Sequence, residues 1–225
     1  MRRALAFAWL YLKRPFLLPR VRKAVLERID DVLLVSTPEV LNPVVFRSGE
    51  LLARTVAVSP LAEPPPTNTR ALDMGTGTGV GAIFLARRGW QQVTAVDLNP
   101  EAVRCARINT LLNRLENRID VRQGDLFEPV QGERFDLILF NPPFFRGEPK
   151  GLFDLAWRAT DVLERFAAGL PAALTDQGRA LLLLSTDGDA AGMLRALETN
   201  GLRYEPAVRK DYGNEVMTIY EVRKE

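Results

Sequence analysis

A glycine-rich turn between a short apolar strand and a helix is the first place where this chain has residues suited to chemistry. Residues 72–79 read LDMGTGTG, so Gly75, Gly77 and Gly79 alternate with threonines such as Thr76, and Asp73 precedes the first glycine by two positions. Glycines let the backbone turn tightly and let a ligand come close, and the free N–H groups of the following helix point toward the same place. The pattern predicts a ligand site beside a carboxylate, which favours a cationic ligand.

The possible ligands of this loop differ in what they require of it. The dinucleotide fingerprint G-x-G-x-x-G fails, because its third glycine is replaced by Val80 or, starting two residues later, by Ala82. A P-loop is excluded because no Gly-Lys-Ser/Thr follows. S-adenosylmethionine carries an ammonium and a sulfonium, so it suits Asp73. A purely structural turn is the remaining alternative, since a glycine loop alone is a weak signal.

Further polar residues stand at the ends of the next predicted strands, where ligands bind in open α/β sheets. Asp97 ends the second strand and is placed to accept hydrogen bonds from both hydroxyls of a ribose. Asp125 follows the third strand and is expected to accept from an adenine amino group. Leu98 and Leu126, the next residues in the chain, complete the predicted cofactor site, and Asn141 ends the fourth strand. Each acid alone is equally explained as a helix cap or a surface charge.

The elements that must position these residues alternate between strand and helix from residue 70 onward. The pattern predicts a Rossmann-like, doubly wound α/β sheet of seven strands, mostly parallel, with an antiparallel hairpin at its C-terminal edge. The expected strands are 71–74, 92–96, 119–122, 135–140 and 180–185, the expected helices are 80–88, 100–112, 155–170 and 190–199, and the expected hairpin is 202–209 with 215–222.

The first 60 residues are predicted to form a basic helical extension and a lid segment in front of a domain spanning 61–225. Residues 1–35 are expected to be helical with breaks near two prolines, and 36–48 to be extended. Ser48 is expected to cap a helix over 50–56, and 46–48 to lie over the cofactor. The apolar run 4–12 is too short to span a bilayer, which takes roughly 20 residues.

Composition limits the chemistry and the partners. The chain has no histidine and one cysteine, Cys105, which excludes histidine-dependent nucleophilic catalysis, an internal disulfide and His- or Cys-based metal sites. We therefore expect no metal, and a reducing, cytoplasmic location. Residues 1–29 carry a net charge of +7 and the remainder −5, which indicates a polyanionic partner such as RNA or, equally, a solvated amphipathic helix.

Four segments together resemble class I S-adenosylmethionine-dependent methyltransferases, and within them the HemK-like small methyltransferase group. They are LDMGTGTG (72–79), AVDLNPEAV (95–103), GDLFEPV (124–130) and FDLILFNPPFF (135–145). The resemblance extends over about residues 36–225. It implies that Asn141, Pro142, Pro143 and Phe144 form the catalytic NPPF motif and that S-adenosylmethionine is the cofactor.

The resemblance also implies the chemistry of this motif. The side-chain oxygen of Asn141 and the backbone carbonyl of Pro142 are expected to accept the N–H groups of a planar amino or amide nitrogen. Pro142 and Pro143 hold these acceptors in place, and Phe144 is expected to stack on the target. Phe145 is expected to pack in the core rather than to extend this aromatic surface.

The substrate stays open at this point. Many protein-glutamine members have Tyr where this chain has Phe144, whereas some RNA guanine-N2 and adenine-N6 enzymes have Phe. The expected partners are therefore RNA or the ribosome, or a protein glutamine as in a release factor, and a small activating subunit is possible. The alternatives are a non-catalytic subunit that binds S-adenosylmethionine as a scaffold, and an NAD-dependent oxidoreductase.

Overall fold

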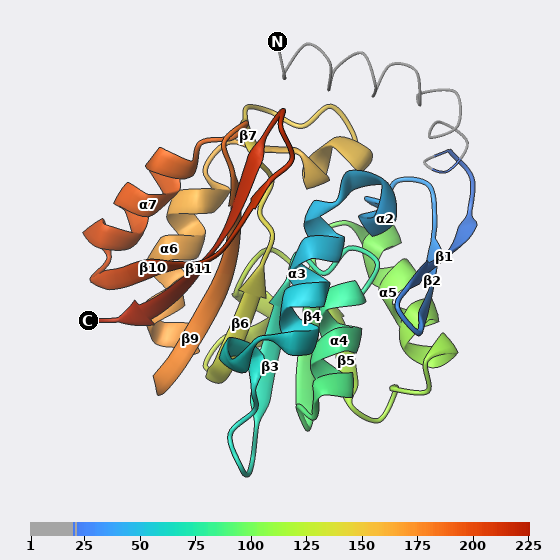
Figure 1. Cartoon of the computed structure of the whole chain (residues 1–225), viewed down its shortest axis with the longest axis horizontal. Coiled ribbons are helices and arrows are strands. Elements are labelled where there is room, and N and C mark those ends of the chain that lie inside the picture. The colour runs from blue at the N-terminus through green and yellow to red at the C-terminus, as the bar shows by residue number, and fades with distance from the viewer. Residues whose placement is uncertain (1–19, 21) are drawn as a thin grey trace.

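The computed structural model describes Arg20 and residues 22–225, and its centre is a seven-stranded sheet in the order β10-β11-β9-β6-β3-β4-β5 (Figure 1). Neighbouring strands from β9 to β5 run parallel, whereas β11 is antiparallel to both β9 and β10. The predicted Rossmann-like sheet with its antiparallel hairpin is confirmed. Its strands are β3 (Arg70–Met74), β4 (Gln92–Asp97), β5 (Ile119–Gln123), β6 (Phe135–Phe140), β9 (Leu174–Ser185), β10 (Leu202–Asp211) and β11 (Val216–Lys224).

Helices cover both faces of this sheet (Figure 1). Residues of β6 alternate between the two layers: Leu137 and Leu139 belong to the core cluster of α3 and α4, and Ile138 and Phe140 to that of α6. A central strand is apolar where it is buried on both faces, which accounts for the apolar run 137–140 that follows the partly buried Asp136. One layer holds α3 (Ser48–Val58), α4 (Val80–Arg88) and α5 (Pro100–Leu112), and the other holds α6 (Val162–Ala173) and α7 (Ala190–Thr199).

The start of α5 shows how local sequence sets an element at the site. Asn99 caps the helix, because its side-chain oxygen accepts from the backbone N–H of Glu101 at 2.9 Å. Pro100 occupies the first helical position, where the missing N–H costs nothing. Both features agree with the sequence, and the bounds of α4, α5 and α7 coincide with those expected.

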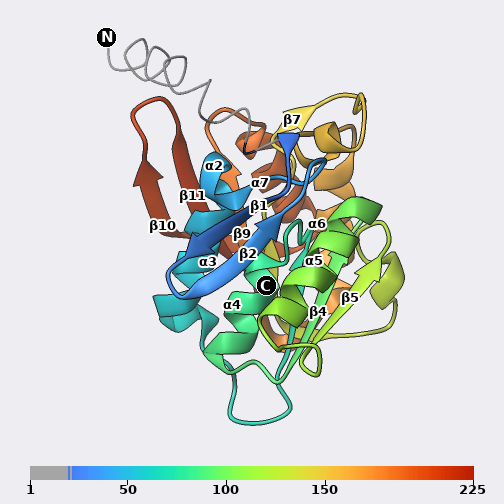
Figure 2. The same ribbon diagram turned by 90° about the vertical axis from the view of Figure 1, so that its right-hand side faces the viewer.

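The prediction of helix up to residue 35 is wrong from residue 25 onward, whereas Arg20 and Arg22 are helical. β1 (Val25–Ile29) and β2 (Val32–Ser36) form an antiparallel hairpin that lies beside α5 (Figure 2). Asp30 makes the tight turn with φ 53°, and Ile29, Val32 and Leu34 are buried in the core cluster of α3 and α4. The overlooked signal was the apolar run 32–35 directly after Asp30-Asp31, a pair of turn-favouring residues that connects the two strands. The rest of the predicted N-terminal helix, 1–19 and 21, lies outside the described residues.

Two further segments differ from expectation. The region 36–48 contains a short helix, α2 (Pro43–Phe46), and Ser48 is the first residue of α3 rather than its cap. The expected helix 155–170 begins later, at Val162, because the chain first forms a 3-10 turn, η3 (Phe153–Ala156), and a two-residue strand pair, β7 (Phe145–Arg146) with β8 (Arg158–Ala159). The remaining 3-10 turns are η1 (Pro60–Ala62) and η2 (Glu128–Val130). Among the described residues, no helix has the length and apolarity that crossing a bilayer demands.

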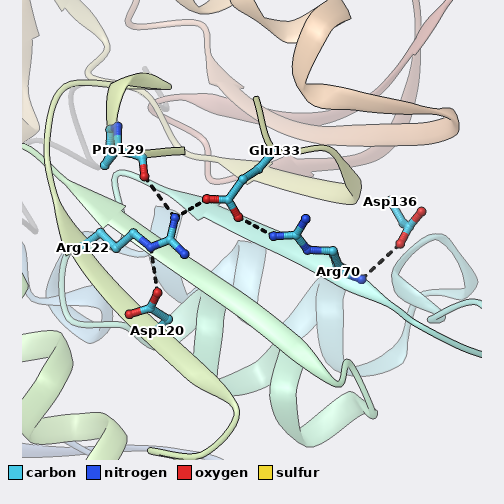
Figure 3. A network of polar contacts seen from close by, with 6 residues as sticks. All are labelled: Arg70, Asp120, Arg122, Pro129, Glu133 and Asp136. Atoms are coloured by element: carbon cyan, nitrogen blue, oxygen red, sulfur yellow. Dashed lines mark hydrogen bonds and ion pairs between the residues drawn. The ribbon is translucent and has the colours of Figure 1, made fainter. Parts of the chain in front are cut away.

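A polar network ties the loop before β6 to the neighbouring strands (Figure 3). The Glu133 carboxylate accepts from the guanidinium groups of both Arg70 and Arg122. Arg122 also bonds to Asp120 at 2.7 Å, and the backbone N–H of Arg70 donates to Asp136 at 3.0 Å. Partial burial alone would raise the pKa of Glu133, but the two arginines outweigh it and lower that pKa.

We expect Glu133→Gln to lower the free energy of unfolding by about 1 kcal/mol, because it weakens two partly buried ion pairs. The pKa of Glu133 is lowered in the folded protein. Its contribution to the free energy of unfolding is therefore complete above the ordinary glutamate pKa, and it is lost as the pH falls through the lowered pKa of the folded protein. Thermal unfolding between about pH 3 and pH 7 measures this. Glu205→Gln, an exposed position on β10, is the control. Equal stability of both variants at pH 7 would contradict the network's contribution.

Candidate active site

The loops that follow β3, β4, β5 and β6 line one cavity of about 300 Å³ at the carboxyl edge of the sheet. This is the position where open α/β sheets bind ligands. Most of the residues singled out in the sequence meet here, namely Asp73, Gly75, Thr76, Gly77, Asp97, Leu98, Asp125, Leu126, Asn141 and Pro143. Gly79, Pro142 and Phe144 do not line the cavity.

The glycine loop owes its shape to two left-handed residues at the cavity. Gly75 and Gly77 have φ values of 63° and 56°, a region that side chains other than glycine enter at a cost. A Cβ atom added to Gly77 would meet no atom within 4 Å, so the loop backbone is open to a ligand there. Gly79 serves another purpose: a Cβ atom there would lie 3.2 Å from Ala106, so its absence lets the start of α4 approach α5.

Asp73 lies beneath the loop with a buried carboxylate. Its Oδ2 accepts from the Thr76 hydroxyl at 2.6 Å and from the backbone N–H of Ala82 at 2.8 Å. Gly81 is required beside it, because a Cβ atom there would approach the carboxylate to 2.6 Å. Burial raises the pKa of Asp73 to about 6 despite these hydrogen bonds. The protein therefore holds a negative charge here at neutral pH, and no cationic side chain of the described residues pairs with it.

Asp97 adds a second carboxylate to the same cavity. Its two oxygens accept from the backbone N–H groups of Gly77 and Asn99, at 2.8 and 2.9 Å. Burial raises its pKa as well. Leu98, the next residue, exposes 48% of its surface while lining the cavity. The site thus combines two acids with an exposed apolar side chain, which suits a cationic ligand that also has an apolar part.

Asp125 differs from the other acids because it already has a cationic partner. Its Oδ2 accepts from Arg165 at 2.6 Å, and Arg165 also pairs with Asp161 at the start of α6. Leu126, next to it, has a left-handed backbone with φ 48° and packs against the core cluster of α6. Asp125, the expected acceptor for an adenine amino group, therefore lies at the cavity, and Arg165 already binds one of its two oxygens.

Two residues that line the cavity, Thr78 and Asn141, each have a buried side-chain oxygen without a hydrogen-bond partner among the described residues. In Asn141 the Nδ2 donates to the Ser48 hydroxyl at 3.0 Å, whereas the buried Oδ1 is the atom without a partner among the described residues. Buried acceptors are normally paired, so an unpaired one beside a cavity indicates a missing donor.

The other residues of the NPPF motif do not all line the cavity. Pro142 is buried and Pro143 lines the cavity. Phe144 packs partly against the core cluster of α3 and α4, and its carbonyl accepts from the backbone N–H of Asp189 at 3.2 Å. The expectation that Phe145 packs in the core is wrong, since it is 38% exposed and its ring centroid lies 6.4 Å from that of Trp157. After the rigid Pro142-Pro143 pair, the chain directs the first aromatic ring inward and the second outward.

Two segments that sequence reasoning did not assign to the site also line the cavity. One comprises Glu39, Val40, Leu41 and Pro43, and the other runs from Pro149 to Val162. They are tied together, because the Glu39 carboxylate accepts from the backbone N–H of Phe153 at 3.0 Å and the Asn99 side chain donates to the Glu39 carbonyl at 2.7 Å. The expected lid at 46–48 is not itself part of the lining. Cys105 is buried, and burial raises its pKa.

Comparison with known proteins agrees with this geometry. The family described as the methyltransferase small domain matches residues 42–197. A protein of Methanocaldococcus jannaschii, provisionally named a protein N5-glutamine methyltransferase, is 33% identical over 80% of this chain and 90% of its own length. A tRNA1(Val) adenine-N6 methyltransferase of Porphyromonas gingivalis is 33% identical over 62% of this chain and 57% of its own.

Solved structures show the same fold. A 16S rRNA guanine-N2 methyltransferase of T. thermophilus, solved with AdoMet and guanosine, superposes with a TM-score of 0.64 at 21% identity, covering 90% of this chain and 50% of that one. The family match covers well over half of the chain, and one relative is similar over nearly its whole length. The chain therefore belongs to the methyltransferase small domain family and is an S-adenosylmethionine-dependent methyltransferase, as its sequence predicted.

Proposed function

We propose that this chain transfers a methyl group to the side-chain amide nitrogen of a protein glutamine. The observation that carries the proposal is the buried, unpaired Oδ1 of Asn141 at the wall of the cavity. An acceptor that lacks a donor suits a ligand with an N–H group, because pairing it removes the cost of a buried unsatisfied oxygen.

The residues of the cavity fit S-adenosylmethionine. The carboxylates of Asp73, which is buried, and of Asp97, which is half-buried, favour its positive charge, and none of the described cationic side chains forms an ion pair with either. In this proposal Asp97 accepts hydrogen bonds from the ribose hydroxyls, the left-handed Gly75 and Gly77 allow close approach of the backbone, and Leu98 contacts the adenine. When bound, the cofactor supplies an activated methyl group on a cationic sulfur.

The remaining task of the protein is to prepare the nitrogen. An amide nitrogen is a poor nucleophile because its lone pair is delocalised into the carbonyl. Asn141 Oδ1 and the Pro142 carbonyl would each accept one of its N–H hydrogens and hold the lone pair toward the methyl group. The two prolines keep these acceptors fixed before the target arrives, so the transition state is stabilised without reorganisation.

The charges around the cavity favour a protein target over RNA. Among the described residues, the two cations that line the cavity are matched by acids. Arg158 pairs with Asp154, and Arg165 pairs with Asp125 and Asp161. Residues 1–19 contain four cations and no acid, so the part of the chain from residue 20 onward has a net charge of −2 although the whole chain has +2. A surface that reads RNA through phosphates needs an excess of cations.

RNA remains the second candidate, because two observations favour it. Eight of the nine charged residues in 1–29 are basic, and Phe144 stands where many glutamine-modifying relatives of the HemK-like group have Tyr. If the basic residues contact phosphates, the affinity for RNA will fall steeply as salt is raised, by roughly one power of the salt concentration for each contact. Binding that does not respond to salt would exclude this candidate.

A competition among acceptors tests the proposal. The full chain is incubated with isotopically labelled S-adenosylmethionine and with recombinant release factor, ribosomal proteins, unmodified 16S rRNA or unmodified tRNA. We expect label in a protein and, after digestion, on a glutamine. Label in an RNA would contradict the proposed glutamine target and identify RNA as the substrate.

The raised pKa of Asp73 gives a pH-dependent prediction. A cationic donor favours the ionised carboxylate, so its affinity is full above about pH 7 and weakens as pH falls through the pKa of about 6. Below this pKa, the affinity for S-adenosylmethionine falls by close to tenfold for each pH unit. Calorimetric titration with S-adenosylmethionine from about pH 5 to pH 8 measures it. In Asp73→Asn the affinity should be lower and should depend less on pH in this range; an undiminished pH dependence in that variant would assign the effect to another group, such as Asp97, whose pKa burial also raises.

A further inference from the structure

Ser48 touches the motif from a distant part of the chain. It is the first residue of α3, is 3% exposed, and its hydroxyl accepts from Asn141 Nδ2 at 3.0 Å, across 93 positions of sequence. The contact therefore joins the segment before the sheet to the end of β6, the strand that carries the motif.

This contact pairs one end of the Asn141 amide and leaves the other end free. The oxygen and the nitrogen of a primary amide have nearly the same shape, so packing alone does not distinguish them. With Nδ2 donating to Ser48, Oδ1 is the end left unpaired. A reversed amide could accept from the Ser48 hydroxyl through Oδ1, but it would leave the N–H hydrogens of Nδ2 without an acceptor, and orphaned buried N–H groups are rarer than orphaned oxygens. It would also turn a donor, not an acceptor, toward the N–H groups of a target.

The backbone around Ser48 is held in an unusual conformation. Arg47 separates α2 from α3 with φ 61°, which is left-handed for a residue with a side chain, and its guanidinium lies 5.1 Å from the centroid of the Tyr212 ring. Gly49 packs so closely that a Cβ atom would lie 3.0 Å from Pro43. Such strained residues persist only where the surroundings hold them and are concentrated at functional sites. Here the strained turn presents the Ser48 hydroxyl to Asn141.

We propose that Ser48 is a positioning residue for methyl transfer: it orients the Asn141 amide so that its oxygen, and not its nitrogen, meets the target. The inference rests on the proposed role of Asn141. It makes the start of α3 part of the active site, although this helix lies outside the strand-end loops that carry the motifs.

Kinetics of matched variants test the proposal. Ser48→Ala should lower kcat about tenfold, the effect of losing one orienting hydrogen bond, while the KM for S-adenosylmethionine stays within about twofold. Ser48→Thr keeps the hydroxyl and should restore most of the rate. Ser59→Ala removes a serine at the other end of α3, where its hydroxyl caps η1, and should leave kcat unchanged. The acceptor is whichever of the proteins and RNAs in the competition takes the label.

The Ser48→Ala substitution, repeated in the Asn141→Asp variant, distinguishes an orienting role of Ser48 from a purely structural one. Asn141→Asp offers an oxygen at both ends, so orientation no longer matters there, and Ser48→Ala should cost less than about twofold in this background. An equal loss in both backgrounds would overturn the proposal, as would a wild-type kcat in Ser48→Ala while Asn141→Ala is inactive. That last pattern leaves the proposed function intact, whereas full activity of Asn141→Ala would reject the function itself.

An NMR readout needs no acceptor substrate and covers the case in which Asn141→Asp is inactive. The side-chain NH₂ signals of Asn141 in ¹⁵N-labelled protein are identified by their loss in Asn141→Asp. We expect Ser48→Ala to shift these signals and to speed their exchange with water, and Ser48→Thr to leave both nearly unchanged. Unaltered Asn141 signals in Ser48→Ala would overturn the proposal.

Discussion

Replacing Asn141 by alanine is expected to lower kcat by about 10²- to 10³-fold while the Kd for S-adenosylmethionine changes by less than about threefold. The reason is that the side-chain oxygen acts on the target nitrogen, and removal of one preorganised hydrogen-bonding group in a water-excluded site has this magnitude. Single-turnover methyl transfer gives the rate, and calorimetry gives the affinity for the cofactor.

Asn117→Ala, at an exposed position after α5, is the matched control and should behave as the wild type. Methyl transfer at the wild-type rate in Asn141→Ala would reject the assignment of this residue. If neither the variant nor the wild type transfers a methyl group although both bind the cofactor, the alternative of a non-catalytic scaffold gains support.

Asp97→Ala is expected to weaken the binding of S-adenosylmethionine by about 100-fold or more. Two hydrogen bonds from ribose hydroxyls to a charged acceptor are lost, each with a contribution of about 1.5–3 kcal/mol. The unliganded protein should not lose stability in proportion, because burial raises the pKa of Asp97 and its charge is therefore unfavourable in the folded state. Calorimetry and thermal unfolding of the same preparation measure the two effects.

Asp97→Asn retains the shape of the side chain and should fall between Asp97→Ala and the wild type in affinity. Asp187→Asn changes an exposed acid in the turn before α7 and should leave binding unchanged. Unaltered affinity in Asp97→Ala would show that the ribose is held elsewhere.

The sequence predicted those elements whose pattern is determined locally. The run FDLILF corresponds to β6 residue for residue, because residues 137–140 are apolar and buried between the two helix layers. Its one polar residue, Asp136, stands next to the start of the strand, where it accepts hydrogen bonds from Arg70 and Thr175. The bounds of α5 follow from the Asn99 cap and Pro100, which act within one helical turn. The strand-end acids meet in one cavity because parallel strands place their carboxyl ends at the same edge of a sheet.

The elements that were missed depend on contacts between distant parts of the chain. The β1–β2 hairpin is stabilised by packing against the α3–α4 cluster. β7 pairs with β8 across an eleven-residue loop, part of which the apolar pattern alone assigned to the helix that is α6. The contacts at the site also join distant parts of the chain. Glu39 reaches the cavity through its bonds with the 149–162 segment and with Asn99, and the partner of Asn141 lies 93 positions away. No local pattern specifies such pairs.

The most direct test of the account is to identify the atom that receives the methyl group. Product from a reaction with deuterated S-adenosylmethionine is digested and analysed by tandem mass spectrometry, with product from Asn141→Ala analysed alongside. The account predicts a methyl group on a planar amide nitrogen of the target, formed by the wild type and nearly absent from the variant. A methyl group on an oxygen, sulfur or carbon atom, or equal methylation by the variant, would contradict it.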